Sequence, residues 1–153
     1  MSAYTDIKSL ANNKSQKSSW WRNQLFFYLS SNVKGVDSVM PGTAVTFGYR
    51  AEYGEKMQFW DKFPMVYIYG EDATHFWGAN VHYLLPEYRF TGFSPAAPAK
   101  TLHKYLRSNV LTPLYGIENS EWQDIGLIPS EQFVMTSNGR TLDIPRTIIY
   151  KRL

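Results

Sequence analysis

The sequence contains no cysteine. It can therefore form neither a disulfide framework nor a thiolate metal site, so the fold must be held by its own core or by neighbouring molecules. The sequence also lacks a run of roughly 20 apolar residues, the length that spans a bilayer, and its first residues show no continuous apolar stretch typical of a signal peptide. We therefore expect a protein that is made in the cytoplasm and does not enter a membrane.

The motifs of common enzyme and cofactor sites are missing as well. There is no GxSxG nucleophile turn and no phosphate-binding GxxxxGK(S/T) or GxGxxG loop. The histidines His75, His82 and His103 are far apart, and none has a second ligand at metal spacing such as HxH or HExxH. Glu71 and Asp72 precede His75, but a position between two expected strands favours ordinary turn polarity over acid-base chemistry. The sequence predicts no catalysis, no cofactor and no bound metal.

Aromatic side chains, by contrast, are abundant. Of 153 residues, 16% are Phe, Trp or Tyr, and 44% are hydrophobic against 19% charged. This length is typical of one domain, which buries roughly 70% of the surface of its unfolded chain. Tyr and Trp combine apolar area with a polar group and are enriched at interfaces. We therefore expect one globular domain that docks on other proteins in a multi-copy assembly.

The net charge of +3 is unevenly distributed. Residues 1–34 carry five basic residues and one acidic residue, a net charge of +4, whereas residues 35–99 carry −3 and residues 100–153 carry +2. Residues 1–18 are rich in Ser, Asn and Lys and predict a flexible basic arm, extended or ordered by a partner, before a single domain over residues 19–153. Such an arm could contact phosphate or an acidic protein surface, or simply be a solvated tail.

Base stacking on aromatic rings needs nearby cations to neutralise phosphate. Here the aromatic residues cluster in the acidic centre, whereas the cations lie on the arm and in residues 100–107. This separation argues against sequence-specific reading of DNA and leaves non-specific contact with the DNA backbone open.

A helix is expected after the arm. Ser18 or Ser19 would cap it, and Asn32 and Gly35 would end it. Four apolar side chains share one face at helical spacing: Trp21, Leu25, Tyr28 and Leu29.

Three short strands are expected next, over residues 44–49, 63–69 and 76–83. Pro64 fits the start of its strand, because it has no N–H for a central ladder. Gly78, in the middle of the third strand, indicates a bulge or a close backbone approach. We expect these strands to form a small curled antiparallel sheet, a half-barrel, covered by one or two helices in an α+β fold.

The remaining elements are shorter. Residues 100–107 predict a helix with Leu102, Tyr105 and Leu106 facing inward, and residues 122–128 are strand-like. Asn138 and Gly139 are typical of a two-residue hairpin turn. The last residues, TIIYKRL, predict a β-prone or extended C-terminal arm.

One long block resembles a family of virion proteins from large contractile-tailed bacteriophages. The block is FWDKFPMVYIYGEDATHFWGANVHYLLPEYR, residues 59–89. The residues that carry the resemblance are Trp60, Asp61, Phe63, Pro64, Gly78, Asn80, His82, Tyr83, Leu84 and Arg89, with an extra Leu85 before Pro86. A fainter match continues at Trp122, Leu127, Pro129, Glu131 and Phe133, so that the resemblance covers about residues 40–135.

The resemblance implies a non-enzymatic component of a phage particle, made in the host cytoplasm. Family members are labelled DNA end protector or virion structural protein. Because the charge is weakly basic, we interpret the chain as a structural subunit of the tail, the baseplate or the head-tail junction that docks on other virion proteins. The alternative is a DNA end protector or a non-specific DNA-binding virion protein.

These interpretations assign candidate residues to three roles. The candidate interface anchors are large aromatic residues: Trp20, Trp21, Trp60, Trp77 and Tyr88. In the alternative, phosphate would be contacted by Lys14, Lys17 and Arg22. Asp61, Asn80 and His82 would be buried structural polar residues, each with a hydrogen-bond partner.

Overall fold

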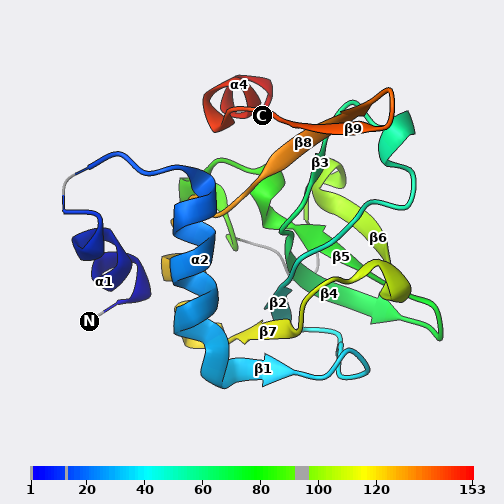
Figure 1. The fold of residues 1–153 in the computed structure, drawn as a ribbon. Coiled ribbons are helices and arrows are strands. Elements are labelled where there is room, and N and C mark those ends of the chain that lie inside the picture. Colours follow the sequence, from blue (N-terminus) through cyan, green and yellow to red (C-terminus); the bar gives the residue numbers. More distant parts are fainter. Residues whose placement is uncertain (1, 13, 92–96) are drawn as a thin grey trace.

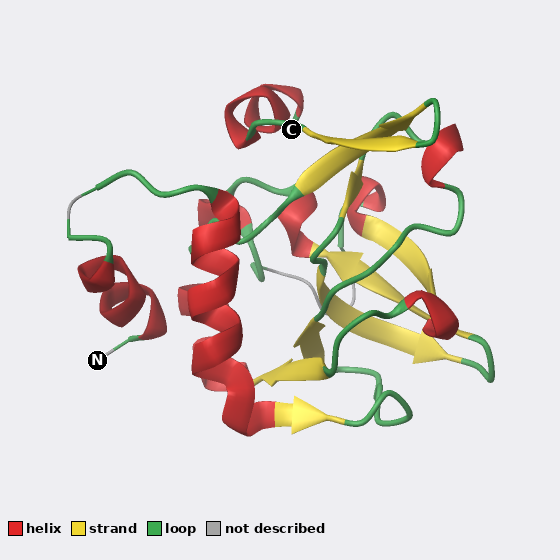
Figure 2. Cartoon of the chain, in the orientation of Figure 1, coloured by secondary structure: helices red, strands yellow, loops and turns green. Residues whose placement is uncertain are grey.

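The computed structural model describes residues 2–12, 14–91 and 97–153 (Figure 1). The described residues form four α-helices and two antiparallel sheets, which confirms the α+β class (Figure 2). The helices are α1 (Ala3–Leu10), α2 (Ser18–Leu29), α3 (Trp122–Gly126) and α4 (Arg146–Arg152). The strands are β1 (Val33–Lys34), β2 (Ala44–Thr46), β3 (Trp60–Asp61), β4 (Met65–Glu71), β5 (His75–Asn80), β6 (Leu102–Leu106), β7 (Leu114–Ile117), β8 (Phe133–Ser137) and β9 (Arg140–Asp143).

The larger sheet has the strand order β1-β7-β2-β4-β5-β6, and both of its faces are covered. Because side chains alternate along a strand, neighbouring residues supply opposite faces. One face packs against α2, which runs along the β1, β7 and β2 side of the sheet in Figure 1. The second face forms a separate cluster: Val45, Phe47, Val66, Ile68, Phe76, Tyr105 and Leu114, with Val39 and Tyr49.

The larger sheet curls without closing into a barrel. Beyond β2 the chain lies against the segment that follows β6, where Tyr49 forms an isolated bridge with Val110. The amide of Leu111 donates to the carbonyl of Gly48 at 2.8 Å, which extends this contact. The second face therefore becomes the inside of the half-barrel that the sequence predicts.

Gly78 permits the closest approach in the sheet. A Cβ at this position would lie 2.0 Å from the carbonyl oxygen of Tyr67 on β4, a distance no real Cβ adopts. The expected close approach at Gly78 is thus confirmed. The register irregularity lies opposite, between Ile68 and Gly70 of β4.

The smaller sheet, β3-β8-β9, contains the predicted hairpin. Asn138 and Gly139 connect β8 to β9 with φ values of 52° and 75°. Positive φ at both central residues is the geometry of a type I′ turn, which matches the twist of the flanking strands. The Asn-Gly prediction is confirmed.

The expected helix over residues 18–29 is confirmed as α2, but its start differs. Lys17 is the N-cap and provides no side-chain cap, whereas both candidate capping serines lie inside the helix. Trp21, Leu25 and Leu29 are buried as expected. Tyr28 is exposed, and its hydroxyl donates to the Glu121 carboxylate at 2.6 Å.

The segment before α2 differs from the predicted extended arm. Residues 3–10 form α1, capped by the Ser2 hydroxyl, which accepts from the amide of Thr5. Ala3 and Ile7 are buried against α2 and α3, because they lie on one face of a short helix. Met1 and Asn13 of the predicted arm lie outside the described residues. The division of the chain at residue 18 stays a prediction.

Three expectations in the second half of the chain are wrong. Residues 102–106 form the edge strand β6 on β5 in place of a helix, which leaves Leu102 half exposed. Residues 122–126 form the helix α3 in place of a strand. The C-terminal segment forms the helix α4 in place of an extended arm, and its Ile149 is buried. No helix in the described part of the chain is both long and apolar enough to cross a membrane.

Candidate functional site

Three polar residues singled out from the sequence meet in the interior. Nδ1 of His82 lies 2.6 Å from Oδ2 of Asp61, and Nδ2 of Asn80 donates to the same oxygen at 3.1 Å. Because a carboxylate can only accept, Nδ1 of His82 carries the proton. Nε2 of His82 lies 3.3 Å from the hydroxyl of Ser130. All four side chains are buried, so this network connects strands β3 and β5 with the chain before β8.

The Asp61 carboxylate remains ionised despite its burial. Burial alone would raise its pKa, but the charge of His82 and hydrogen bonds from His82, Phe63 and Asn80 outweigh burial and lower the pKa below the usual value. The amide of Gln132 also donates to this carboxylate, at 3.2 Å.

We expect the lowered pKa of Asp61 to make stability sensitive to acid. A carboxyl with a lower pKa in the folded state contributes stability above its unfolded pKa of about 3.9 and loses it as pH falls through the folded pKa. Urea unfolding at a series of pH values should therefore show the free energy of unfolding falling below about pH 4. The Asp61→Asn variant should cost about 1.5–3 kcal/mol at pH 7 and should flatten this fall.

The control is Asp37→Asn, which changes a fully exposed carboxylate. Its acid profile should match that of the unchanged protein. An Asp61→Asn profile that ran parallel to the unchanged protein down to pH 2 would contradict the role given to Asp61.

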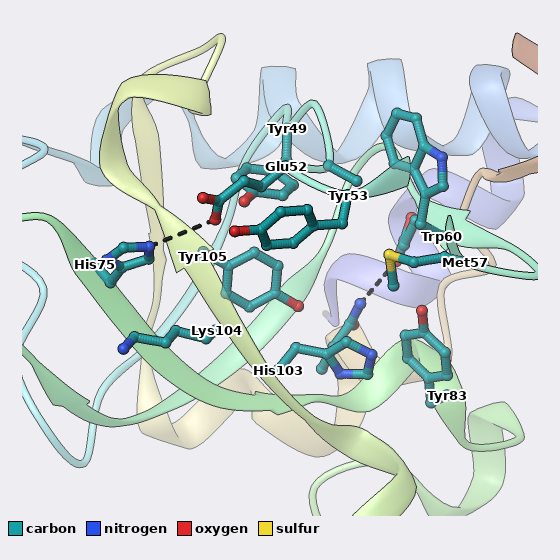
Figure 3. A pocket seen from close by; sticks show the side chains of 13 residues that line it. Tyr49, Glu52, Tyr53, Met57, Trp60, His75, Tyr83, His103, Lys104 and Tyr105 are labelled. Carbon is teal, nitrogen blue, oxygen red and sulfur yellow. Dashed lines mark hydrogen bonds and ion pairs between the residues drawn. The ribbon is translucent and has the colours of Figure 1, made fainter. Parts of the chain in front are cut away.

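A cavity of about 580 Å³, shown in Figure 3, adjoins this network. Asp61 and Asn80 lie at its wall, and Tyr49 and Tyr105 belong both to the cavity and to the inner core cluster. The other lining residues come from the loop before β3, from β3, β5 and β6, and from the turn after β5: Ala51, Glu52, Tyr53, Met57, Trp60, His75, Tyr83, His103 and Lys104.

The walls of this cavity are mainly aromatic rings. The His103 ring stacks on Tyr83 with centroids 4.4 Å apart and an interplanar angle of 27°. Tyr105 stands nearly perpendicular to Tyr49, at 4.9 Å and 83°. Figure 3 shows Tyr53 and Trp60 on the side of the cavity opposite His103. Flat apolar faces therefore enclose the cavity from more than one direction.

The cavity has few polar side chains besides the tyrosine hydroxyls, and the surroundings of His103 determine its protonation state. Nδ1 of His103 lies 2.9 Å from the carbonyl of Thr101, so Nδ1 donates and Nε2 is an acceptor. Burial lowers the pKa of His103, which keeps the ring neutral at pH 7. Glu52 pairs with Nε2 of His75 at 3.5 Å, and Lys104 lies at the rim.

A second hollow, of about 770 Å³, adjoins the cavity on the other side of the loop over residues 50–57. Tyr53 and Trp60 line both hollows. The second hollow carries three basic residues, Arg50, Lys56 and Lys62, against the carboxylates of Glu52 and Glu55. We call the first hollow the aromatic cavity and the second the basic groove.

A buried ion pair connects segments that lie outside both hollows. Arg89 and Glu131 are both fully buried, with Nη2 and Oε2 3.0 Å apart. The Arg89 guanidinium also donates to the carbonyls of Leu84, Gly126 and Ile128. The Tyr150 hydroxyl of α4 donates to Oε1 of Glu131 at 2.5 Å. The sequence resemblance included both charged residues but did not indicate that they pair.

The candidate interface anchors are in different environments. Trp21 and Trp60 are only 8% and 7% exposed, so they are core residues of this chain. Trp20 and Trp77 are half-buried, and Tyr88 is 58% exposed. An interface role stays a prediction for Trp20, Trp77 and Tyr88.

The candidate phosphate contacts also divide into two groups. Lys14 and Lys17 are exposed around the start of α2. Arg22 lies over the ring of Phe63, with its Cζ atom 4.0 Å from the ring centroid, and burial lowers the pKa of Arg22. Its Nε atom is buried without a hydrogen-bond partner among the described residues. A phosphate role for Lys14, Lys17 and Arg22 stays a prediction.

The described residues contain no cluster of three or more His, Cys, Asp or Glu side chains that could hold a metal ion. The residues missed by sequence reasoning are those of the aromatic cavity that come from separate segments, chiefly Tyr53, His103 and Tyr105. The only local signal for them was the high aromatic content, which does not indicate where rings meet.

Comparison with known proteins gives one family. The family model described as phage T4 terminal DNA protecting protein matches residues 2–94, which is more than half of the chain. The match spans α1, α2 and strands β1 to β5, and so includes Asp61, Asn80 and His82 of the buried network and one wall of both hollows. No curated protein and no solved structure matches.

Proposed function

We propose that this chain, which belongs to the phage T4 terminal DNA protecting protein family, binds the ends of linear phage DNA and shields them from exonucleases. The observation that carries the proposal is the family match over residues 2–94. Membership also confirms the resemblance to phage proteins, of whose span, residues 40–135, the match covers the part up to residue 94. Of the two interpretations of the sequence, the match favours the DNA end protector over the tail or baseplate subunit.

The basic groove supports contact with DNA. Arg50 and Lys56 are exposed, and Lys62 is half-buried at the same hollow. Basic side chains that neutralise phosphates release condensed counterions, and this gain supplies most non-specific affinity for DNA. A groove with three such residues beside an aromatic cavity combines the two features of surfaces that hold single-stranded nucleic acid. These three cations come from the same stretch of sequence as Tyr53 and Trp60, and the cations of the arm and of residues 100–107 do not line the groove.

We further propose that protection is by occupation of the end, without catalysis. The histidines of the aromatic cavity are committed to structural contacts: His103 donates to a backbone carbonyl and His75 pairs with Glu52. A general base needs a nucleophile or a water held within hydrogen-bond reach of its substrate, and the Glu52-His75 pair lies at the exposed rim. A bound protein that blocks the last nucleotides needs no chemical step.

Docking on other virion proteins is a second candidate role, compatible with the first. Phe27 is 80% exposed on α2 and Tyr88 is 58% exposed after β5, and exposed aromatic residues of this size anchor interfaces. A protein that holds a DNA end in a particle needs neighbours, in a tail, a baseplate or a head-tail junction. We place the protein in the virion, after synthesis in the host cytoplasm.

An exonuclease assay tests the main proposal. The protein should slow digestion of a linear duplex by a processive exonuclease, and short linear duplexes should compete for it far better than closed circles of equal mass. Replacing Arg50, Lys56 and Lys62 by Ala should weaken binding. It should also reduce the slope of log K against log salt by about 0.9 for each phosphate that the variant no longer neutralises.

The matched control replaces Lys151 and Arg152, two exposed basic residues of α4 away from both hollows, by Ala. This variant should protect DNA ends nearly as well as the unchanged protein. The Lys14→Ala and Lys17→Ala variant tests the remaining candidate phosphate contacts in the same assay. Equal affinity for circles and linear DNA, with unhindered digestion, would exclude an end-protecting function.

A further inference from the structure

We propose that the aromatic cavity binds the unstacked base of the last nucleotide of a DNA strand while the basic groove holds the adjoining phosphates. This inference rests on the proposed function and deepens it, because it says how an end is distinguished from the interior of DNA. The ligand chemistry is a single nucleobase, and the source to which we commit is a strand terminus.

The size and walls of the cavity suit one flat ring system. Its volume of about 580 Å³ lies within the roughly 300–1,000 Å³ of sites that enclose small ligands. Tyr53, His103 and Trp60 present ring faces or edges to this space from different elements. Every base has a π face, so stacking on aromatic side chains is favourable without regard to sequence. An end-binding protein of a phage needs such tolerance.

The polar groups at the cavity favour a base over a phosphate. The Asp61 carboxylate lines the aromatic cavity and not the basic groove, so it repels an anion from the cavity alone, whereas Glu52 lines both hollows. Nε2 of the neutral His103 ring can accept a hydrogen bond from an exocyclic amino group. The three cations Arg50, Lys56 and Lys62 lie instead in the adjoining groove. The two hollows thus separate the two chemical parts of a nucleotide.

The loop over residues 50–57 lies between the aromatic cavity and the basic groove. Tyr53 lines both hollows, is 61% exposed, and has the ammonium of Lys56 over its ring at 5.8 Å. A base on one side of this ring would place its own phosphate near Lys56 on the other. A short stretch of chain therefore sets the spacing between base and phosphate.

The arrangement explains why an end would be preferred. A base inside a duplex is stacked on both faces and paired, so it reaches a cavity only if it is flipped out at a cost in free energy. The last base of a strand has one stacking neighbour, and in an overhang it has no pairing partner. The cavity therefore selects termini by access, with no need to read sequence.

Fluorescence of 2-aminopurine tests the inference. The probe is placed at the last nucleotide of a 3′ overhang, at the last nucleotide of a 5′ overhang, or at an internal position of the same duplex. Binding of the unchanged protein should alter the emission of one terminal probe and leave the internal probe unchanged. The responding overhang identifies the polarity of the bound strand.

The variant Tyr53→Ala should weaken binding to that overhang by about 5- to 100-fold, the range expected for loss of one stacking side chain. Tyr53→Phe keeps the ring and should restore the affinity. Leu10→Ala removes a similarly exposed apolar side chain outside both hollows and is the matched control. Because Tyr53 is mostly exposed, thermal melting of the variants should match that of the unchanged protein.

The outcomes separate this inference from the proposed function. The protein could bind and protect linear DNA while the emission of the terminal probes stays unchanged and Tyr53→Ala binds DNA as tightly as the unchanged protein. That result would overturn the base site and leave end protection standing. If a free mononucleotide displaced the overhang DNA from the protein at an equal concentration, the ligand of the cavity would be a free nucleotide. That result would overturn the proposal that the cavity binds a strand terminus. A chain that bound no linear DNA would overturn both.

Discussion

Glu131→Gln should lower the free energy of unfolding by about 3–5 kcal/mol, the usual cost of removing one partner of a buried ion pair. The substitution keeps the shape of the side chain but leaves the Arg89 guanidinium charged, fully buried and without a counterion. It also leaves one acceptor oxygen where the carboxylate has two, so the amide cannot keep both the bond from Arg89 and the bond from Tyr150 as they are. A domain is usually stable by about 5–15 kcal/mol, so this loss would take much of the margin. Guanidinium unfolding followed by circular dichroism measures it directly.

Two companion variants locate the cause of that loss. Glu118→Gln removes an exposed carboxylate and should change stability by less than about 0.5 kcal/mol. Tyr150→Phe removes only the hydroxyl that donates to Glu131 and should cost about 1.5–3 kcal/mol. If Glu131→Gln proved as stable as Glu118→Gln, the Arg89-Glu131 pair would not be a structural requirement.

Gly78→Ala should be more disruptive than its single added methyl group suggests. Overpacking usually costs about 1–3 kcal/mol because side chains can move aside. Here the new Cβ would meet the backbone carbonyl of Tyr67 at 2.0 Å, so β4 and β5 must separate or shift. Such a shift would also displace Asn80 at the end of β5. We expect loss of most soluble protein, a large fall in melting temperature, and loss of DNA end protection in what remains.

Gly35→Ala is the matched control for this prediction. The atom nearest to a Cβ added at Gly35 would be Oγ of Ser38, at an ordinary van der Waals distance of 3.7 Å, and the φ of Gly35 is not positive. The variant should be neutral or slightly stabilising, since Ala reduces the freedom of the unfolded chain. Equal melting temperatures for Gly78→Ala and Gly35→Ala would refute the close approach at Gly78.

The parts of the fold that the sequence predicts are those with a strict local signal. Alternation at Val45, Phe47 and Tyr49 places all three on one side of the sheet, as the structure has them. The Asn138-Gly139 pair predicts its turn because few other residues adopt two successive positive φ values. In both cases the determinant lies within a few residues.

The wrong predictions share a different cause, which is competition from distant contacts. Residues 100–107 have the apolar spacing of a helix, but hydrogen bonding along β5 makes them a strand. The β-branched residues of the C-terminal segment favour a strand, but burial of Ile149 and the bond from Tyr150 to Glu131 hold it as a helix. Local propensity is weak enough for tertiary contacts to override it.

The candidate site was only partly visible in the sequence. Asp61, Asn80 and His82 were singled out as polar residues that need partners, and the structure brings them together. The sequence does not predict the aromatic cavity, because Tyr53 and His103 are 50 positions apart and line one space only in the folded chain. No periodicity within one segment encodes such a meeting.

The position of Asp61 has a consequence for how the molecule comes apart. Asp61 is the last residue of β3 in the smaller sheet, and its partners His82 and Asn80 follow or end β5 of the larger one. Opening either sheet by itself would separate this carboxylate from its partners, a cost that adds to the loss of the contacts within that sheet. The network therefore couples the two sheets, and we expect a mechanical pull or a protease to find no intermediate in which only one has melted.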